Sequence, residues 1–137
     1  MKKIILIICG ALVLLTAIAF FVLKQNEALF FGPSNEELAI RAGRIWYETG
    51  FYRTEASIKT ESELKEYLAS RSELGLIINL ENLLTFNNGE LSDYIDKIVN
   101  RRTNEPCNIK TTLVAIFPKE PFGPTDYTIE VAKLDCD

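Results

Sequence analysis

Histidine is absent from this chain of 137 residues. Its absence removes the most common general base, proton shuttle and metal ligand of proteins, and it excludes sites in which histidine activates serine or cysteine. The sequence also lacks glycine-rich phosphate-binding motifs and the signature motifs of zinc proteases and serine hydrolases. We therefore expect a protein that is not an enzyme and that holds neither a cofactor nor a metal.

Basic side chains are few outside the N-terminal segment. Residues 1–27 hold three lysines and one glutamate, whereas the remaining 110 residues hold 12 basic and 18 acidic side chains, a net charge of −6. Phosphate backbones repel an acidic surface, so nucleic acid is not expected as a partner. No Asn-x-Ser/Thr acceptor for N-glycosylation occurs either, which favours a prokaryotic cell envelope.

The longest uncharged run, residues 4–23, predicts a transmembrane helix. It contains 20 residues, of which 14 are Leu, Ile, Val or Phe. A helix of this length spans about 30 Å, the thickness of the hydrocarbon core of a bilayer. Lys2 and Lys3 precede the run, so we expect a single-pass protein of the cell membrane with its N-terminus in the cytoplasm and its C-terminal domain outside.

Two other interpretations of this segment remain open. Ala17-Ile18-Ala19 resembles a signal-peptidase site, and cleavage after Ala19 would give a secreted protein. The apolar residues 20–23 continue past this site, which favours an uncleaved anchor. A lipoprotein attached through Cys9 is disfavoured, because Ile8 stands where a small residue is required. All three interpretations place the domain outside the cytoplasm.

The exported part contains only two cysteines, Cys107 and Cys136. An even number of cysteines in an oxidising compartment predicts a disulfide between them, with two free thiols as the alternative. A zinc site would need more ligands than these two thiols.

Hydrophobic periodicity predicts an α+β fold. We expect a single N-terminal transmembrane helix, followed by a small extracytoplasmic domain of three to four helices and a C-terminal β-hairpin clamped by the disulfide. The anchor and juxtamembrane segment are assigned to residues 1–31 and the domain to residues 32–137, because Gly32-Pro33 interrupts a continuous helix.

The first helix of the domain is predicted to begin at a capping box formed by Ser34 and Glu37. Its apolar stripe includes Trp46, which we expect in the core, and Gly50 is expected to end the helix. Residues 51–59 fit a short strand or a packed loop. An exposed aromatic surface is possible at three nearby positions, Tyr47, Phe51 and Tyr52.

A second capping box, Thr60 with Glu63, predicts another helix that ends near Ser72. Three of its residues have the spacing of an inward face: Leu64, Tyr67 and Leu68. The acidic residues of these helix starts are interpreted as solvated helix surface rather than as acid–base groups.

Residues 76–78 predict a short strand or turn that passes into a helix, and Asn87-Asn88-Gly89 predicts a turn. Residues 91–99 then show the most regular helical stripe of the chain, with Arg101-Arg102 at its expected C-terminus.

Residues 109–117 and 127–134 have the period of strands. If Cys107 lies opposite Cys136, the register of the hairpin follows, and Lys110 faces Lys133. Its apolar face is then built from three pairs: Thr112 with Val131, Val114 with Ile129, and Ile116 with Tyr127.

The loop at residues 118–126 is the predicted contact site for a partner. Three prolines and a glycine restrict its conformations, and Phe122 lies at its centre, so the loop loses little entropy on binding. We expect Phe122, flanked by Pro121 and Pro124, to extend from the domain and dock on a partner protein. The alternative is a loop that folds back and buries Phe122 in the core.

The sequence therefore favours a membrane-anchored, extracytoplasmic interaction or accessory module of a cell-envelope complex. Its expected partners are the lipid bilayer, through residues 4–23, and a protein of the envelope. A small-ligand binder or an enzyme without a recognisable motif is a further alternative.

An N-terminal apolar helix with a C-terminal cysteine pair also resembles the layout of type IV pilins, which implies a filament or pseudopilin-like subunit. Pilins carry a glutamate five residues after their peptidase site. If Gly10 ended the leader here, that position would be Leu15.

Overall fold

The computed structural model describes residues 32–136, and the residues from Asn35 onward form one compact unit. Within this part of the chain no helix is both long and apolar enough to cross a membrane. The anchor predicted at residues 4–23, the cleavage alternative at Ala19 and Cys9 all lie outside the described residues. The domain boundary predicted after residue 31 also stays a prediction.

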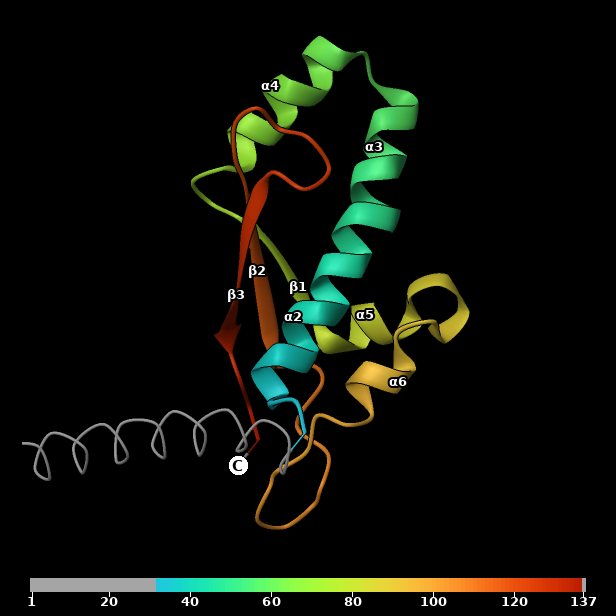
Figure 1. The fold of residues 1–137 in the computed structure, drawn as a ribbon, viewed down its shortest axis with the longest axis vertical. Helices are drawn as coiled ribbons and strands as arrows, with labels where there is room; N and C mark the ends of the chain where they lie inside the picture. Colours follow the sequence, from blue (N-terminus) through green and yellow to red (C-terminus); the bar gives the residue numbers. More distant parts are fainter. Residues whose placement is uncertain (1–31, 137) are drawn as a thin grey trace, which may run out of the picture. The chain divides into compact units, whose positions relative to one another are not determined.

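The fold is α+β, as predicted, with helices packed on a three-stranded antiparallel sheet of order β1-β2-β3 (Figure 1). In chain order the elements are α2 (Asn35–Ile45), the π-helix η1 (Trp46–Phe51), α3 (Tyr52–Ile58), α4 (Glu61–Arg71), β1 (Leu76–Asn79), α5 (Leu80–Thr85), the 3₁₀-helix η2 (Phe86–Gly89), α6 (Ser92–Ile95), β2 (Leu113–Pro118) and β3 (Tyr127–Lys133).

The first helix does not end at Gly50, so that prediction is wrong. The chain continues through η1 into α3, and residues 51–58 are helical rather than a strand or loop. Gly50 serves close packing instead. A Cβ atom at this position would lie 2.4 Å from Cε2 of Phe86, so only glycine lets the Phe86 ring approach the helix.

The aromatic residues of this helix are arranged differently from the prediction. Tyr47 is fully buried and belongs to the core, whereas Trp46 is only partly buried against it. Leu38 and Ala42 of the predicted stripe are buried, as are Ala39 and Gly43 beside them, whereas Ile45 is only partly buried like Trp46.

Three local predictions are confirmed. The capping box of α4 is present: the backbone N–H of Glu63 donates to Thr60, whose own N–H donates to the Glu63 carboxylate. β1 passes directly into α5, whose N-cap residue Asn79 accepts a hydrogen bond from Asn82 N at 2.9 Å. Positive φ values mark the predicted turn at Asn87, Asn88 and Gly89.

The long helix predicted over residues 91–99 is wrong, because α6 has only four residues. Leu91, Ile95 and Ile98 are buried as expected. The backbone N–H groups at the end of the stripe are bonded elsewhere: Val99 N donates to the Asn35 side chain rather than to Ile95 O, and Ile98 N donates to Ile95 O rather than to Tyr94 O. These partners replace the i to i+4 bonds that would extend the helix.

β2 and β3 form the predicted antiparallel pair, but the register differs by two residues. Val114 lies opposite Val131 and Ile116 opposite Ile129, and an irregularity between Leu113 and Val114 places Leu113 opposite Lys133. The predicted contact of Lys110 with Lys133 is therefore wrong. From Val114 to Pro118 a shift of two residues keeps the side chains on their predicted face, so Val114 and Ile116 are buried.

Candidate binding surface at the tip of the β2–β3 hairpin

The loop between β2 and β3 lies beside α4 at one end of the domain (Figure 1). The start of α2 and the C-terminus lie at the opposite end. The predicted contact residues are therefore remote from Asn35, where the chain enters the compact unit.

The loop is held by hydrogen bonds between its own residues. Lys119 N donates to Asp126 O at 2.8 Å, which closes the base of the loop. Phe122 N donates to Lys119 O at 2.7 Å, and Gly123 N donates to the Asp126 carboxylate at 2.8 Å. These bonds give residues 119–126 a defined shape.

Phe122 adopts a left-handed backbone conformation, with a φ of 64°. This region is unfavourable for a bulky L-residue, and the surrounding structure must compensate for its cost. The hydrogen bond from its own N–H to Lys119 O helps to hold this conformation.

The Phe122 side chain forms the wall between two depressions. The larger has a volume of about 540 Å³ and lies between the loop and α4. Its lining residues are Ser62, Lys65, Glu66, Ala69, Glu120, Pro121 and Phe122. We call this depression the tip notch. The smaller depression, of about 270 Å³, lies on the Tyr52 side of Phe122 and is bordered by Leu64 and Gly123.

The structure brings together two of the three predicted contact residues. Pro121 and Phe122 both line the tip notch, whereas Pro124 is exposed and lines neither depression. Phe122 itself is half-buried. It neither projects freely into solvent nor belongs to the buried core. That it contacts a partner remains a prediction.

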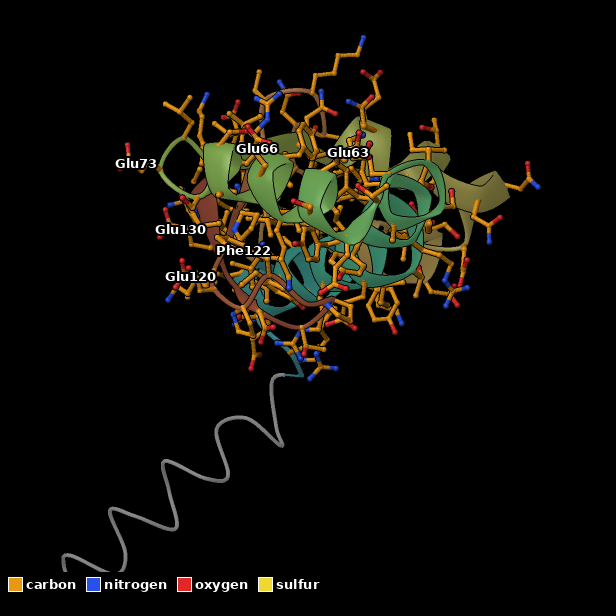
Figure 2. The ribbon with its side chains drawn as sticks, turned by 90° about the horizontal axis from the view of Figure 1, so that it is seen from above. Glu63, Glu66, Glu73, Glu120, Phe122 and Glu130 are labelled. Atoms are coloured by element: carbon orange, nitrogen blue, oxygen red, sulfur yellow. A yellow bond between two sulfur atoms is a disulfide. The ribbon has the colours of Figure 1, made fainter. Side chains whose placement is uncertain are left out.

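Unpaired carboxylates surround the tip notch. Figure 2 shows Glu73, Glu130 and Glu120 along one side of this end of the domain, with Glu66 and Phe122 beside them. All four glutamates are exposed, and none forms an ion pair with a described residue.

Two lysines near α4 are paired with glutamates, whereas Arg71 and Lys119 form no ion pair with a described residue. Lys65 lies 2.6 Å from Glu61, and this hydrogen bond lowers the pKa of Glu61 and raises that of Lys65. Lys59 pairs with Glu55, and the Arg71 guanidinium lies over the Tyr67 ring. The surface around the notch therefore has a local excess of negative charge.

A cluster of aromatic rings extends below the loop. Tyr47 and Tyr127 lie with their ring centroids 4.7 Å apart, and Tyr127 donates a hydrogen bond to Glu48 at 2.5 Å. Among the described residues the Tyr47 hydroxyl has no hydrogen-bond partner. Burial, with smaller contributions from Tyr52 and Asp126, raises the pKa of Tyr47 to about 12. Burial and the bond to Glu48 also raise the pKa of Tyr127.

Sequence reasoning missed the side of α4 that faces the loop. Ser62, Glu66 and Ala69 line the notch at helical spacing, but the inward stripe of Leu64 and Leu68 was the only face considered. The signal that could have indicated this face is Ala69, a small residue seven positions after Ser62 on a helix face that is otherwise polar.

The disulfide predicted between Cys107 and Cys136 is confirmed, with a Cα–Cα distance of 4.2 Å. It lies at the start of α2, because the Asn35 side-chain nitrogen is 3.8 Å from Cys107 Sγ and 3.7 Å from Cys136 Sγ. Within residues 32–136, no three cysteine or carboxylate side chains are grouped so that they could share a metal ion.

A third depression, of about 610 Å³, lies where η1 meets η2. Its lining is mainly polar and includes Thr49, Arg53, Asn87 and Glu90. Asn87 donates to the Glu90 carboxylate at 2.5 Å, so these two side chains satisfy each other across its rim.

No protein-family model matches the chain, and neither a curated protein nor a solved structure shows significant similarity to it.

Proposed function

We propose that the chain is a membrane-anchored, extracytoplasmic interaction module of a cell-envelope complex, without catalytic activity, and that it docks a partner protein at the tip notch. The observation that carries this proposal is the preformed apolar notch between Phe122, Pro121 and Ala69. A side chain inserted there meets groups that are already held in place, so little conformational entropy is lost on binding.

The position of the notch supports the same proposal. It lies at the end of the domain opposite Asn35, the first residue of the compact unit. In a chain anchored through residues 4–23, a surface at this end is accessible to other proteins of the envelope. The confirmed disulfide is consistent with an oxidising compartment.

Site-specific crosslinking in native membranes tests the proposal. A photoreactive residue is placed at Ala69, which lines the notch, and in a separate variant at Ala56, an exposed alanine of α3. We expect one defined crosslinked partner from position 69 and none from position 56. Equal crosslinking at both positions, or none at position 69, contradicts docking at the notch.

N-terminal sequencing and protease protection test the membrane part separately. We expect the mature chain to begin at Met1 or Lys2 and its domain to be cleaved only when protease has access to the outer side of the membrane. A mature chain that begins at Phe20 would identify a secreted protein.

The second candidate function is a filament or pseudopilin-like subunit. The Cys107–Cys136 disulfide favours it, because a C-terminal cysteine pair is part of the layout that resembles type IV pilins. Crosslinks from several surface positions to further copies of this chain would support this function over docking of a different protein.

A further inference from the structure

We infer that the tip notch selects a cationic partner segment, in which an apolar side chain is flanked by lysine or arginine. This inference rests on the proposed docking function and adds the chemistry of the ligand. It has two parts: an apolar contact with Phe122, and an electrostatic contact with the glutamates around it.

The apolar part follows from the lining of the notch. Phe122 and Pro121 form one wall, and Ala69 on α4 leaves the opposite wall open. A volume of about 540 Å³ is sufficient for one large apolar or aromatic side chain together with its neighbours. Phe122 is half-buried, so part of its ring is available for contact.

The electrostatic part follows from the pairing of charges. Glu66 and Glu120 line the notch from opposite sides, and neither has an ion-pair partner among the described residues. Lys65 also lines the notch, but Glu61 neutralises it at 2.6 Å. Glu73 and Glu130 add negative charge at the same end (Figure 2).

Such a rim attracts cations and repels anionic ligands. An anionic lipid headgroup or a phosphorylated peptide would meet unpaired carboxylates, whereas lysine or arginine beside the inserted side chain would find partners on both sides of the notch. Lys119 is the one basic residue of residues 119–126, and it opposes this attraction.

The test is a selection of peptides displayed on phage, with the full chain in nanodiscs of neutral lipid as the target. We expect enrichment of peptides with one apolar residue between lysines or arginines. A representative peptide should bind at least tenfold more weakly to Phe122→Ala, as expected for a binding hot spot. Ala69→Gln fills the notch without changing its charge and should have a similar effect. Ala56→Gln is the matched control.

Charge reversal tests the electrostatic part. In the double variant Glu66→Lys with Glu120→Lys, we expect the selected peptides to become acidic, whereas Glu105→Lys in the distant loop should leave the selection basic. Lys119→Ala should strengthen binding of the basic peptide, and raising the salt concentration should weaken it.

The outcomes separate the two proposals. Peptides that depend on Phe122 and Ala69 but show no charge preference overturn the cationic chemistry and leave docking at the notch intact. No enrichment at all, or enrichment unaffected by Ala69→Gln, overturns both. Tighter binding to phosphatidylglycerol vesicles than to any basic peptide, or self-association of the chain that Ala69→Gln abolishes, identifies a lipid surface or a second copy as the occupant and overturns the inference.

Discussion

The two ends of the domain use their polar groups in opposite ways. At the disulfide end, the Asn35 side chain donates to Val99 O at 2.7 Å, and the Asn100 side chain donates to Cys136 O at 2.5 Å. Both bonds join parts of the chain that are far apart in sequence. At the tip end, the hydrogen bonds of the loop stay within residues 119–126, and the nearby glutamates are unpaired.

The polar groups of the disulfide end hold the fold together, whereas those of the tip end remain available to a ligand. Polar groups that satisfy each other contribute to the stability of the fold but are not available to a ligand. Unpaired carboxylates around an apolar notch contribute little to stability and remain available for binding. Stability and recognition are therefore expected to respond to different substitutions in this domain.

The largest effect is expected from the disulfide. Replacing Cys107 and Cys136 together by serine removes a crosslink between residues 29 positions apart. In the chain-entropy model this costs about 3–4 kcal/mol of unfolding free energy, which urea denaturation measures. Hydrogen exchange should become faster at the amide of residue 107, whereas the Phe122 amide in the tip loop should be less affected. A loss below about 1 kcal/mol would contradict the clamping role.

Alkaline pH should lower the free energy of unfolding through Tyr47, which belongs to the aromatic cluster below the tip loop. Burial raises the pKa of Tyr47 to about 12, so between pH 10 and 12 the folded state keeps a proton that the unfolded state loses. Stability therefore falls as pH rises through this window, by roughly 2–3 kcal/mol for a shift of this size.

Thermal unfolding of wild type and Tyr47→Phe across this pH range measures the effect. The variant should show a smaller decline, although Tyr127, whose pKa is also raised, still contributes. Below pH 9 the variant should be at least as stable as wild type, because the Tyr47 hydroxyl has no hydrogen-bond partner among the described residues. Identical slopes for both proteins would show that Tyr47 does not titrate as inferred.

Removing a single polar link at the disulfide end should cost less unfolding free energy than removing the disulfide. Asn35→Ala removes the hydrogen bonds to both the carbonyl and the N–H of Val99, and we expect a loss of about 1–2 kcal/mol in urea denaturation. Asn82→Ala, at an exposed position of α5, is the control and should stay within about 0.5 kcal/mol. Equal losses of stability at the two positions would show that the bonds of Asn35 to Val99 contribute no more than an exposed asparagine does.

The smallest expected effect concerns the backbone of the tip loop. Because Phe122 has a φ of 64°, Phe122→Gly should be more stable than Phe122→Ala by about 1 kcal/mol, although alanine is usually the better residue. Thermal unfolding compares the two variants, and both should lose binding at the notch. If the alanine variant is the more stable one, the loop does not hold this conformation in solution.

The features that the sequence predicted correctly depend on neighbouring residues. The capping box of Thr60 and Glu63 and the turn at residues 87–89 form from side chains and backbone within a few positions of each other. The alternation of inward and outward side chains in the paired parts of β2 and β3 was also predicted correctly, because a register shift of two residues leaves a side chain on the same face of the sheet.

The wrong predictions share a different cause. Gly50 looks like a helix end in sequence, but the ring of Phe86, 36 residues later, makes it a packing residue. The helix predicted over residues 91–99 is shorter because the Asn35 side chain accepts the Val99 N–H that would continue it. Neither partner is close enough in sequence for periodicity to indicate it.

The same difference between local and distant contacts applies to the candidate site. That residues 118–126 form a restricted loop with a central aromatic residue follows from their own composition, because proline and glycine act on the local backbone. What this loop faces depends instead on the packing of distant elements. Phe122 lines the same notch as Ala69 and Glu66 of α4 because the β2–β3 loop and α4 lie at the same end of the domain, and proximity across more than 50 residues of chain leaves no periodic pattern in the sequence.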